Sequence, residues 1–155
     1  MLFQEEQYQY MLAALQEAEK ALVENEIPVG AVIIYQNKII GRGYNQVERL
    51  KDPTAHAEMI AITAAANHLD TWKLNECDIY VTLEPCVMCT GAILNARIRT
   101  IYFSLYDPKF GACGSIYNIA EEGKTNHKVK IYSGIFIAES EKLLRSFFQQ
   151  KRTDS

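Results

Sequence analysis

Residues 79–89 read Ile79-Tyr80-Val81-Thr82-Leu83-Glu84-Pro85-Cys86-Val87-Met88-Cys89, and they predict a strand that passes directly into a helix. The first five are apolar, β-branched or aromatic, which is typical of a buried strand. Pro85 suits the first turn of a helix, which we expect to continue to about Asn95. Cys86 and Cys89 are three positions apart, so both sulfur atoms fall on one face of that helix.

The segments on either side alternate between helical and strand-like patterns of apolar residues. We expect helices at about Glu5–Asn25, at Ala55–His68 with Thr54 as N-cap, and at Ala138 to about Gln150, with further strands at Val29–Tyr35, Ile39–Tyr44, Ile98–Ser104 and Val129–Ser133. The first two strands form an antiparallel hairpin, and crossover helices after the third and fourth strands make those neighbours parallel. This order predicts an α/β protein, a three-layer α/β/α sandwich around a mixed five-stranded sheet, in a single domain of residues 1–155.

Composition and charge narrow the classes of function. The formal net charge of −3 argues against extensive contact with a nucleic-acid backbone, although a small local basic patch is compatible with it. The apolar runs are strand-sized, so we expect no segment that spans a membrane. The N-terminal sequence lacks the basic stretch and apolar core of a signal peptide, so we expect a cytoplasmic protein.

Three residues form a good set of zinc ligands, namely His56, Cys86 and Cys89. A tetrahedral zinc ion with three protein ligands keeps its fourth position for a water molecule, whose pKa it lowers toward roughly 7. Glu58 lies two positions after His56, and on an ideal helix such residues point to different sides. That spacing favours Glu58 as the carboxylate that takes a proton from the water. The pattern therefore predicts a hydrolytic site that removes an amino group from a ring carbon.

Two other interpretations of these residues stay open. A structural zinc site would be closed by a fourth ligand, for which the candidates are Cys77, Cys113, His68 and His127. A redox dithiol at Cys86 and Cys89 would account neither for the His56-x-Glu58 pattern nor for the proline before Cys86. Cys77 and Cys113 are expected to be plain thiols, buried or partly so.

Two strings closely resemble the cytidine and deoxycytidylate deaminase superfamily, whose signature is H-x-E followed by P-C-x-x-C. They are Thr54-Ala55-His56-Ala57-Glu58-Met59 and Thr82-Leu83-Glu84-Pro85-Cys86-Val87-Met88-Cys89. Further segments resemble the bacterial tRNA-specific adenosine deaminases within it, so the resemblance covers nearly the whole chain. These segments are Ile27-Pro28-Val29-Gly30-Ala31-Val32, Gly43-Tyr44-Asn45, Asp107-Pro108-Lys109-Phe110-Gly111-Ala112-Cys113-Gly114-Ser115, Asn126-His127-Lys128-Val129 and the terminal Leu143-Leu144 to Phe147-Phe148.

The resemblance implies a cytidine deaminase-like fold and the zinc-dependent hydrolytic deamination of adenosine to inosine at the wobble position of a tRNA anticodon, chiefly of an arginine tRNA. It also implies the tRNA anticodon stem-loop as partner and a homodimer with one zinc ion per subunit. His56, Cys86 and Cys89 match the zinc ligands, and Glu58 matches the proton shuttle. Short apolar stretches near the zinc ligands, such as Ala92-Ile93-Leu94, are candidates for the dimer interface.

The same resemblance assigns substrate contacts to five further residues. Asn45 matches a residue that hydrogen-bonds the flipped nucleoside, although an asparagine there also suits a plain turn. Ile27 and Val29 match walls that pack on the base, although core strand residues would look the same. Asp107 and Lys109 match a loop that holds the nucleotides flanking the target, where a carboxylate can accept a hydrogen bond from a ribose 2′-OH. An ordinary solvated loop is the alternative for these two residues.

Two other functions stay open beside this one. One is an enzyme that acts on a free nucleobase, such as guanine or cytosine. The negative net charge of the chain favours it, whereas the segment Gly111-Ala112-Cys113-Gly114-Ser115 disfavours it. A zinc-stabilised RNA-binding module without catalysis is the third hypothesis. The basic residues of the C-terminal third either form a binding surface or are merely solvated: Lys124, Lys128, Lys130, Lys142, Arg145, Lys151 and Arg152.

Overall fold

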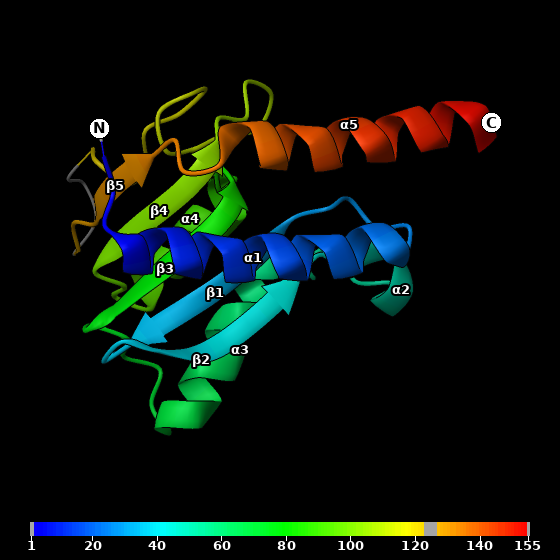
Figure 1. Cartoon of the computed structure of the whole chain (residues 1–155). Coiled ribbons are helices and arrows are strands. Elements are labelled where there is room, and N and C mark those ends of the chain that lie inside the picture. The colour runs from blue at the N-terminus through cyan, green and yellow to red at the C-terminus, as the bar shows by residue number, and fades with distance from the viewer. Residues whose placement is uncertain (1, 123–126, 155) are drawn as a thin grey trace.

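The computed structural model describes residues 2–122 and 127–154, so Lys124 and Asn126 lie outside the described residues. Its centre is a five-stranded sheet in the order β2-β1-β3-β4-β5 (Figure 1). The strands are β1 (Gly30–Tyr35), β2 (Lys38–Tyr44), β3 (Cys77–Leu83), β4 (Thr100–Leu105) and β5 (Lys130–Ser133). Each lies within two residues of its predicted bounds, because the runs of apolar and β-branched residues coincide with buried strands.

The sheet is mixed, as predicted. β1 pairs antiparallel with β2 and with β3, whereas β4 runs parallel to both β3 and β5. One detail of the prediction is wrong: the described parts of the connection from β4 to β5, residues 106–122 and 127–129, contain no helix. This connection instead makes hydrogen bonds to the segment that follows β3, which hold it near the ends of the strands.

Helices cover both faces of the sheet (Figure 1). α1 (Glu5–Val23) packs over β1, and α5 (Ile137–Asp154) packs beside α1 against β4. α3 (Ala57–Leu69) packs against β1 and β2 on the opposite face, next to α4 (Val87–Asn95). The predicted three-layer α/β/α sandwich is therefore confirmed. None of the described helices has the length and apolar character needed to cross a membrane.

The start of α3 differs from the prediction. The helix begins at Ala57 with His56 at the N-cap position, and Thr54 does not cap it. The N–H and the hydroxyl of Thr54 both donate to Asp52 Oδ1, so they belong to the preceding turn. The chain also forms a one-turn helix that we did not expect, α2 (Val47–Leu50). Both differences concern the loop whose end places the first zinc ligand.

Two glycines let helices lie very close to the sheet. A Cβ atom at Gly43 would overlap the carbonyl oxygen of Ala57 and lie 2.8 Å from the nitrogen of Ala61. A Cβ atom at Gly30 would likewise overlap the carbonyl oxygen of Ala14 in α1. Only a hydrogen atom fits at these positions, and alanines on the helices complete the close approach. The contact at Gly43 therefore fixes the height of the first turn of α3 above the sheet.

Candidate zinc and substrate site

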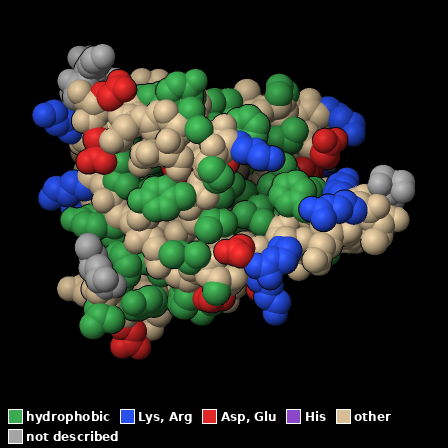
Figure 2. All heavy atoms as spheres, turned by 90° about the horizontal axis from the view of Figure 1, so that it is seen from above, with side chains coloured by type: hydrophobic (Ala, Val, Ile, Leu, Met, Phe, Trp, Pro, Cys, Tyr) green, Lys and Arg blue, Asp and Glu red, His purple; other side chains and the backbone are tan. Residues whose placement is uncertain are grey.

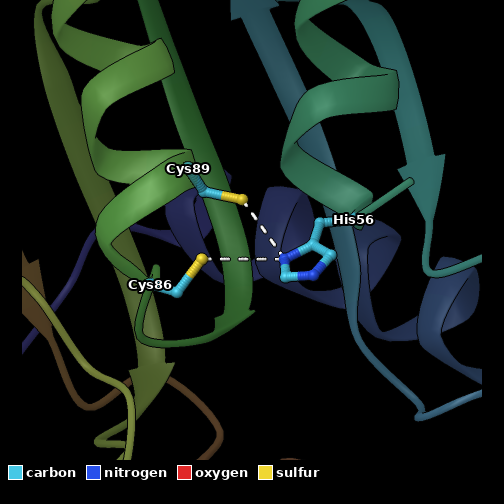
Figure 3. Close-up of side chains that lie close together, drawn as sticks. All are labelled: His56, Cys86 and Cys89. Carbon is cyan, nitrogen blue, oxygen red and sulfur yellow. Dashed lines mark hydrogen bonds between the residues drawn. The ribbon is translucent and has the colours of Figure 1, made fainter. Parts of the chain in front are cut away.

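The three predicted zinc ligands come together where α3 and α4 begin (Figure 3). His56 has an extended backbone with φ −78° and ψ 154°, and its carbonyl oxygen accepts a hydrogen bond from the N–H of Ile60. Cys86 is the corresponding N-cap residue of α4, and Cys89 lies in the first turn of that helix. Leu83, the last residue of β3, is three positions before Cys86. The ligands therefore lie beyond the carboxyl end of β3, where α/β proteins commonly bind ligands.

The spacing of the three ligating atoms fits zinc. His56 Nδ1 lies 3.7 Å from Cys86 Sγ and 3.5 Å from Cys89 Sγ (Figure 3). A tetrahedral zinc ion with bonds of about 2.0 Å to nitrogen and 2.3 Å to sulfur separates such atoms by roughly 3.5 Å. One imidazole and two thiolates are also the borderline-soft set that zinc prefers. Both distances from the imidazole nitrogen to the sulfur atoms are thus already close to those around a bound zinc ion.

The described residues add no fourth side chain to this cluster, which contains His56, Cys86 and Cys89 alone. The four candidates for a closed structural site have other surroundings. Cys113 lies 3.4 Å from the hydroxyl oxygen of Thr90, and His127 Nε2 lies 2.7 Å from the carbonyl oxygen of Ile98. Cys77 begins β3, at the end remote from the ligands, and His68 is exposed in the last turn of α3. This arrangement is that of a three-ligand site with one position left for water.

Hydrogen bonds between the three ligands shift their pKa values. The pKa of the Cys86 thiol is lowered to about 4, because Cys89 and His56 both hydrogen-bond to its sulfur. The pKa of Cys89 is raised, because its proton is held in the hydrogen bond to Cys86 and because the thiol is buried. The hydrogen bond to Cys86 also raises the pKa of His56. Cys86 therefore favours the thiolate form that a metal ligand needs, whereas Cys89 would lose its proton when zinc binds.

Glu58 is buried beside the ligands but is not a member of the cluster. It is 4% exposed in the first turn of α3, and its carboxyl group hydrogen-bonds to the thiol of Cys89. Burial raises its pKa to about 7. A carboxyl group that titrates close to neutral pH can both accept and return a proton under working conditions.

The structure brings together three of the predicted substrate residues next to the start of α3. Asn45 follows β2 directly, and its N–H donates to the carbonyl oxygen of Val29 over 3.1 Å. The N–H of Val29 donates in turn to the carbonyl oxygen of Ile27 over 2.8 Å. Asn45 and Val29 are buried, whereas Ile27 is 41% exposed. The N–H of Gln46 donates to the carbonyl oxygen of Ala55, which ties this segment to the residue before the histidine ligand.

The other two predicted substrate residues lie on the loop that follows β4. Asp107 Oδ1 accepts hydrogen bonds from the N–H groups of Lys109 and Phe110, over 3.0 and 3.3 Å, so this carboxylate shapes the turn. Lys109 is exposed, and the ring of Phe110 is 67% exposed. These hydrogen bonds are equally compatible with an ordinary solvated loop and with a loop that meets RNA, so a contact of either residue with substrate stays a prediction.

One residue of the site was missed by the sequence analysis. Glu84 stands directly before the Pro-Cys motif and is 2% exposed. Its carboxylate accepts hydrogen bonds from the N–H groups of Asp107, Cys113 and Ser115, over 2.9, 2.9 and 3.1 Å, and from the Ser115 hydroxyl. Its place beside the motif was the only signal in the sequence, because the donors come from a loop more than twenty residues further along the chain.

Comparison with known proteins agrees with this geometry. Residues 4–105, which include the three ligands, match the model of the cytidine and deoxycytidylate deaminase zinc-binding region. The chain is 44% identical over 145 residues to a tRNA-specific adenosine deaminase of Aquifex aeolicus, which covers 94% of this chain and 95% of that protein.

Two solved structures have the same fold. One comes from a study of A-to-I editing by tRNA:A34 deaminases at the wobble position of transfer RNA, with a TM-score of 0.85, 40% identity and coverage of 88% of this chain and 99% of that one. The other is a guanine deaminase of Nitrosomonas europaea, with a TM-score of 0.78 and 22% identity over 95% of this chain and 86% of that one, and it supports the fold alone. By its sequence, its fold and its zinc ligands, the chain belongs to the cytidine and deoxycytidylate deaminase family, in the branch of the tRNA-specific adenosine deaminases.

Proposed function

We propose that this protein is a zinc-dependent hydrolase that converts adenosine to inosine at the wobble position of a tRNA anticodon. The observation that carries the proposal is the cluster of one imidazole and two thiols with a buried carboxyl group beside it. The choice of tRNA among the substrates of this fold is supported by the 44% identity to a tRNA-specific adenosine deaminase over nearly the whole of both chains.

His56, Cys86 and Cys89 would hold the zinc ion, and when bound it supplies an acidified water molecule. Glu58 would take one proton from the attacking water and deliver it to N1 of the adenine ring as the bond forms between the water oxygen and C6. Glu58 would then pass the second proton of that water to the amino group as the bond between C6 and nitrogen breaks, so that adenosine and water give inosine and ammonia. Its raised pKa, about 7 before the positive ion is present, suits a group that must hold a proton for only part of the cycle.

Recognition of the target falls to residues before β1 and after β2, which lie next to the start of α3. We propose that the amide of Asn45 hydrogen-bonds the flipped adenosine and that Ile27 and Val29 pack on its base. The half-exposed side chain of Ile27 next to the buried Val29 and Asn45 supports a pocket wall that reaches the surface here. Asp107 and Lys109 would contact the flanking nucleotides from the loop after β4, with Asp107 placed to meet a ribose 2′-OH.

Contacts with the RNA backbone are expected to be few, because the net charge is −3. Figure 2 shows Lys and Arg side chains along the projecting end of α5, whose last turn contains Lys151 and Arg152. Part of this charge is engaged within the protein, since Arg145 pairs with Glu141 and the Lys151 ammonium lies 5.6 Å from the centre of the Phe147 ring. We propose that the end of α5 is an auxiliary contact for RNA.

We also propose that the protein is a homodimer and acts in the cytoplasm, where tRNA is found and its four cysteines would stay as free thiols. The stretch Ala92-Ile93-Leu94 is a poor interface, because Ile93 and Leu94 are buried in the core. The outward face of α4 is a better candidate, since this helix carries no charged residue and Val87 is 48% exposed. Light scattering tests the proposal, and a mass of 17.6 kDa in solution would contradict it.

The test of the activity is to incubate purified zinc-loaded protein with tRNA and to sequence the tRNA before and after. Inosine is read as guanosine, so we expect conversion at one anticodon position. Glu58→Ala should keep its fold and its zinc while losing deamination, and an unchanged rate in this variant would remove Glu58 from the mechanism. Release of ammonia from guanine, cytosine or adenine, with none from tRNA, would overturn the proposal in favour of a free-base deaminase.

A further inference from the structure

Glu84 is the most completely hydrogen-bonded carboxylate near the zinc site. Three backbone N–H groups and one hydroxyl group donate to its two oxygen atoms, as described above. Its burial is nearly complete, at 2% exposure. A buried carboxylate costs free energy unless such donors satisfy it, so each of these contacts holds the loop from which it comes.

The contacts of Glu84 join two parts of the site that are separate in the sequence. On one side, Glu84 is followed directly by Pro85 and by the ligand Cys86. On the other, its donors lie at both ends of the loop 107–115. A second link runs beside it, because the N–H of Ala112 donates to the carbonyl oxygen of Pro85 over 2.9 Å.

The loop is also shaped to receive this carboxylate. A Cβ atom at Gly111 would overlap the carboxylate of Glu84, so the loop passes over it with backbone alone. The side chains of Lys109 and Phe110, which directly precede Gly111, are exposed. The hydrogen bonds to Glu84 thus fix the backbone of the loop, while the exposed side chains of Lys109 and Phe110 remain accessible to a ligand.

We propose that Glu84 is a positioning residue for substrate binding, which sets the distance between the zinc ligands and the loop 107–115. This inference rests on the proposed function, in which the loop meets nucleotides that flank the target. A flexible loop would have to be ordered each time that RNA binds, and the anchor removes that cost in advance. Glu84 is not one of the three zinc ligands and does not contact Glu58, so we expect the chemical step itself not to depend on it.

Glu84→Gln tests the inference. The amide group is of similar size, but its two N–H groups would face backbone N–H groups, so at least one contact of the loop would be lost. We expect the KM for an RNA anticodon stem-loop to rise on the order of tenfold, with kcat within about threefold of the wild type and zinc content unchanged. Ser115→Ala removes only the hydroxyl contact and should raise KM by a smaller factor. This variant still tests the inference if Glu84→Gln folds poorly.

Glu17→Gln is the matched control. Glu17 is a buried carboxylate in α1, 4% exposed, whose partner is Lys20 of the same helix. Its replacement should leave the KM for the stem-loop unchanged. A lowered kcat with unchanged KM in Glu84→Gln and Ser115→Ala would mean that the anchor merely maintains the fold, and it would overturn the inference. So would wild-type values of both constants.

The two proposals fail in different ways. If the wild-type protein deaminates the stem-loop but both anchor variants keep the wild-type KM, only the role of Glu84 is wrong. If the wild-type protein neither deaminates the stem-loop nor binds it in a fluorescence anisotropy titration, the proposed function and the inference are both overturned.

Discussion

Replacing Gly43 by alanine should weaken zinc binding although residue 43 touches no ligand. The added Cβ atom would lie 2.8 Å from the nitrogen of Ala61 and would overlap the carbonyl oxygen of Ala57, where ordinary contacts begin at 3.4 Å. The difference between 3.4 and 2.8 Å requires the first turn of α3 to retreat from β2 by at least about 0.6 Å. His56 is the residue immediately before that turn, whereas Cys86 and Cys89 are carried by α4.

This displacement exceeds the tolerance of the site. Metal–ligand bonds vary by about 0.2 Å, and the present distances of 3.5 and 3.7 Å between nitrogen and sulfur already match zinc. We expect zinc affinity to fall by roughly 10- to 100-fold, as for changes next to metal ligands in general. The overpacking itself should cost about 1–3 kcal/mol of the free energy of unfolding.

The assay is a competition titration of zinc against a chromophoric chelator, combined with urea unfolding of the metal-free protein. Gly41→Ala is the control, because its Cβ would overlap the carbonyl oxygen of Ala61 and lie 3.0 Å from the nitrogen of Ala65, one turn further from His56. It should destabilise the fold by a similar amount with a smaller loss of zinc affinity. Equal zinc affinities of the two variants, or a wild-type affinity for Gly43→Ala, would refute the reasoning.

Four further outcomes are expected. Cys86→Ser should lose both zinc and activity, and a variant that kept one zinc per chain by elemental analysis would contradict the ligand set. In metal-free protein, iodoacetamide should alkylate Cys86 at a rate nearly constant from pH 8 down to about 6, because a pKa lowered to about 4 leaves the thiolate intact there; a tenfold slower rate per pH unit would mean an ordinary thiol. Asp107→Asn keeps an acceptor for its turn and should reduce the preference for a ribose over a deoxyribose target, and identical discrimination would remove Asp107 from that role. Phe110→Ala should lower kcat/KM on the stem-loop by roughly tenfold through lost stacking on a flanking base, an effect that must vanish on RNA that is abasic at that nucleotide.

The strand–helix junction and the zinc ligands were predictable because their signals are local. A proline after an apolar run marks the junction between β3 and α4, and two cysteines three residues apart fall on one helix face whatever surrounds them. The start of α3 was predicted less well. A threonine two residues before His56 has the residue type of an N-cap, but Thr54 belongs to a turn closed by Asp52, and the helix begins only at Ala57. Which of two plausible caps is used depends on the path of the loop, which local preferences do not specify.

The identity of the chemistry was thus present in residue types and spacings, since an imidazole and two thiols select zinc through their electronic character. Folding decided how that chemistry can be used. Burial gives Glu58 a pKa of about 7, and this depends on the neighbours packed around it. Glu84 likewise obtains its four donors from a loop that reaches it only because β4 lies parallel to β3. Desolvation and long-range hydrogen bonds arise from packing between distant segments, and no local pattern of residues encodes them.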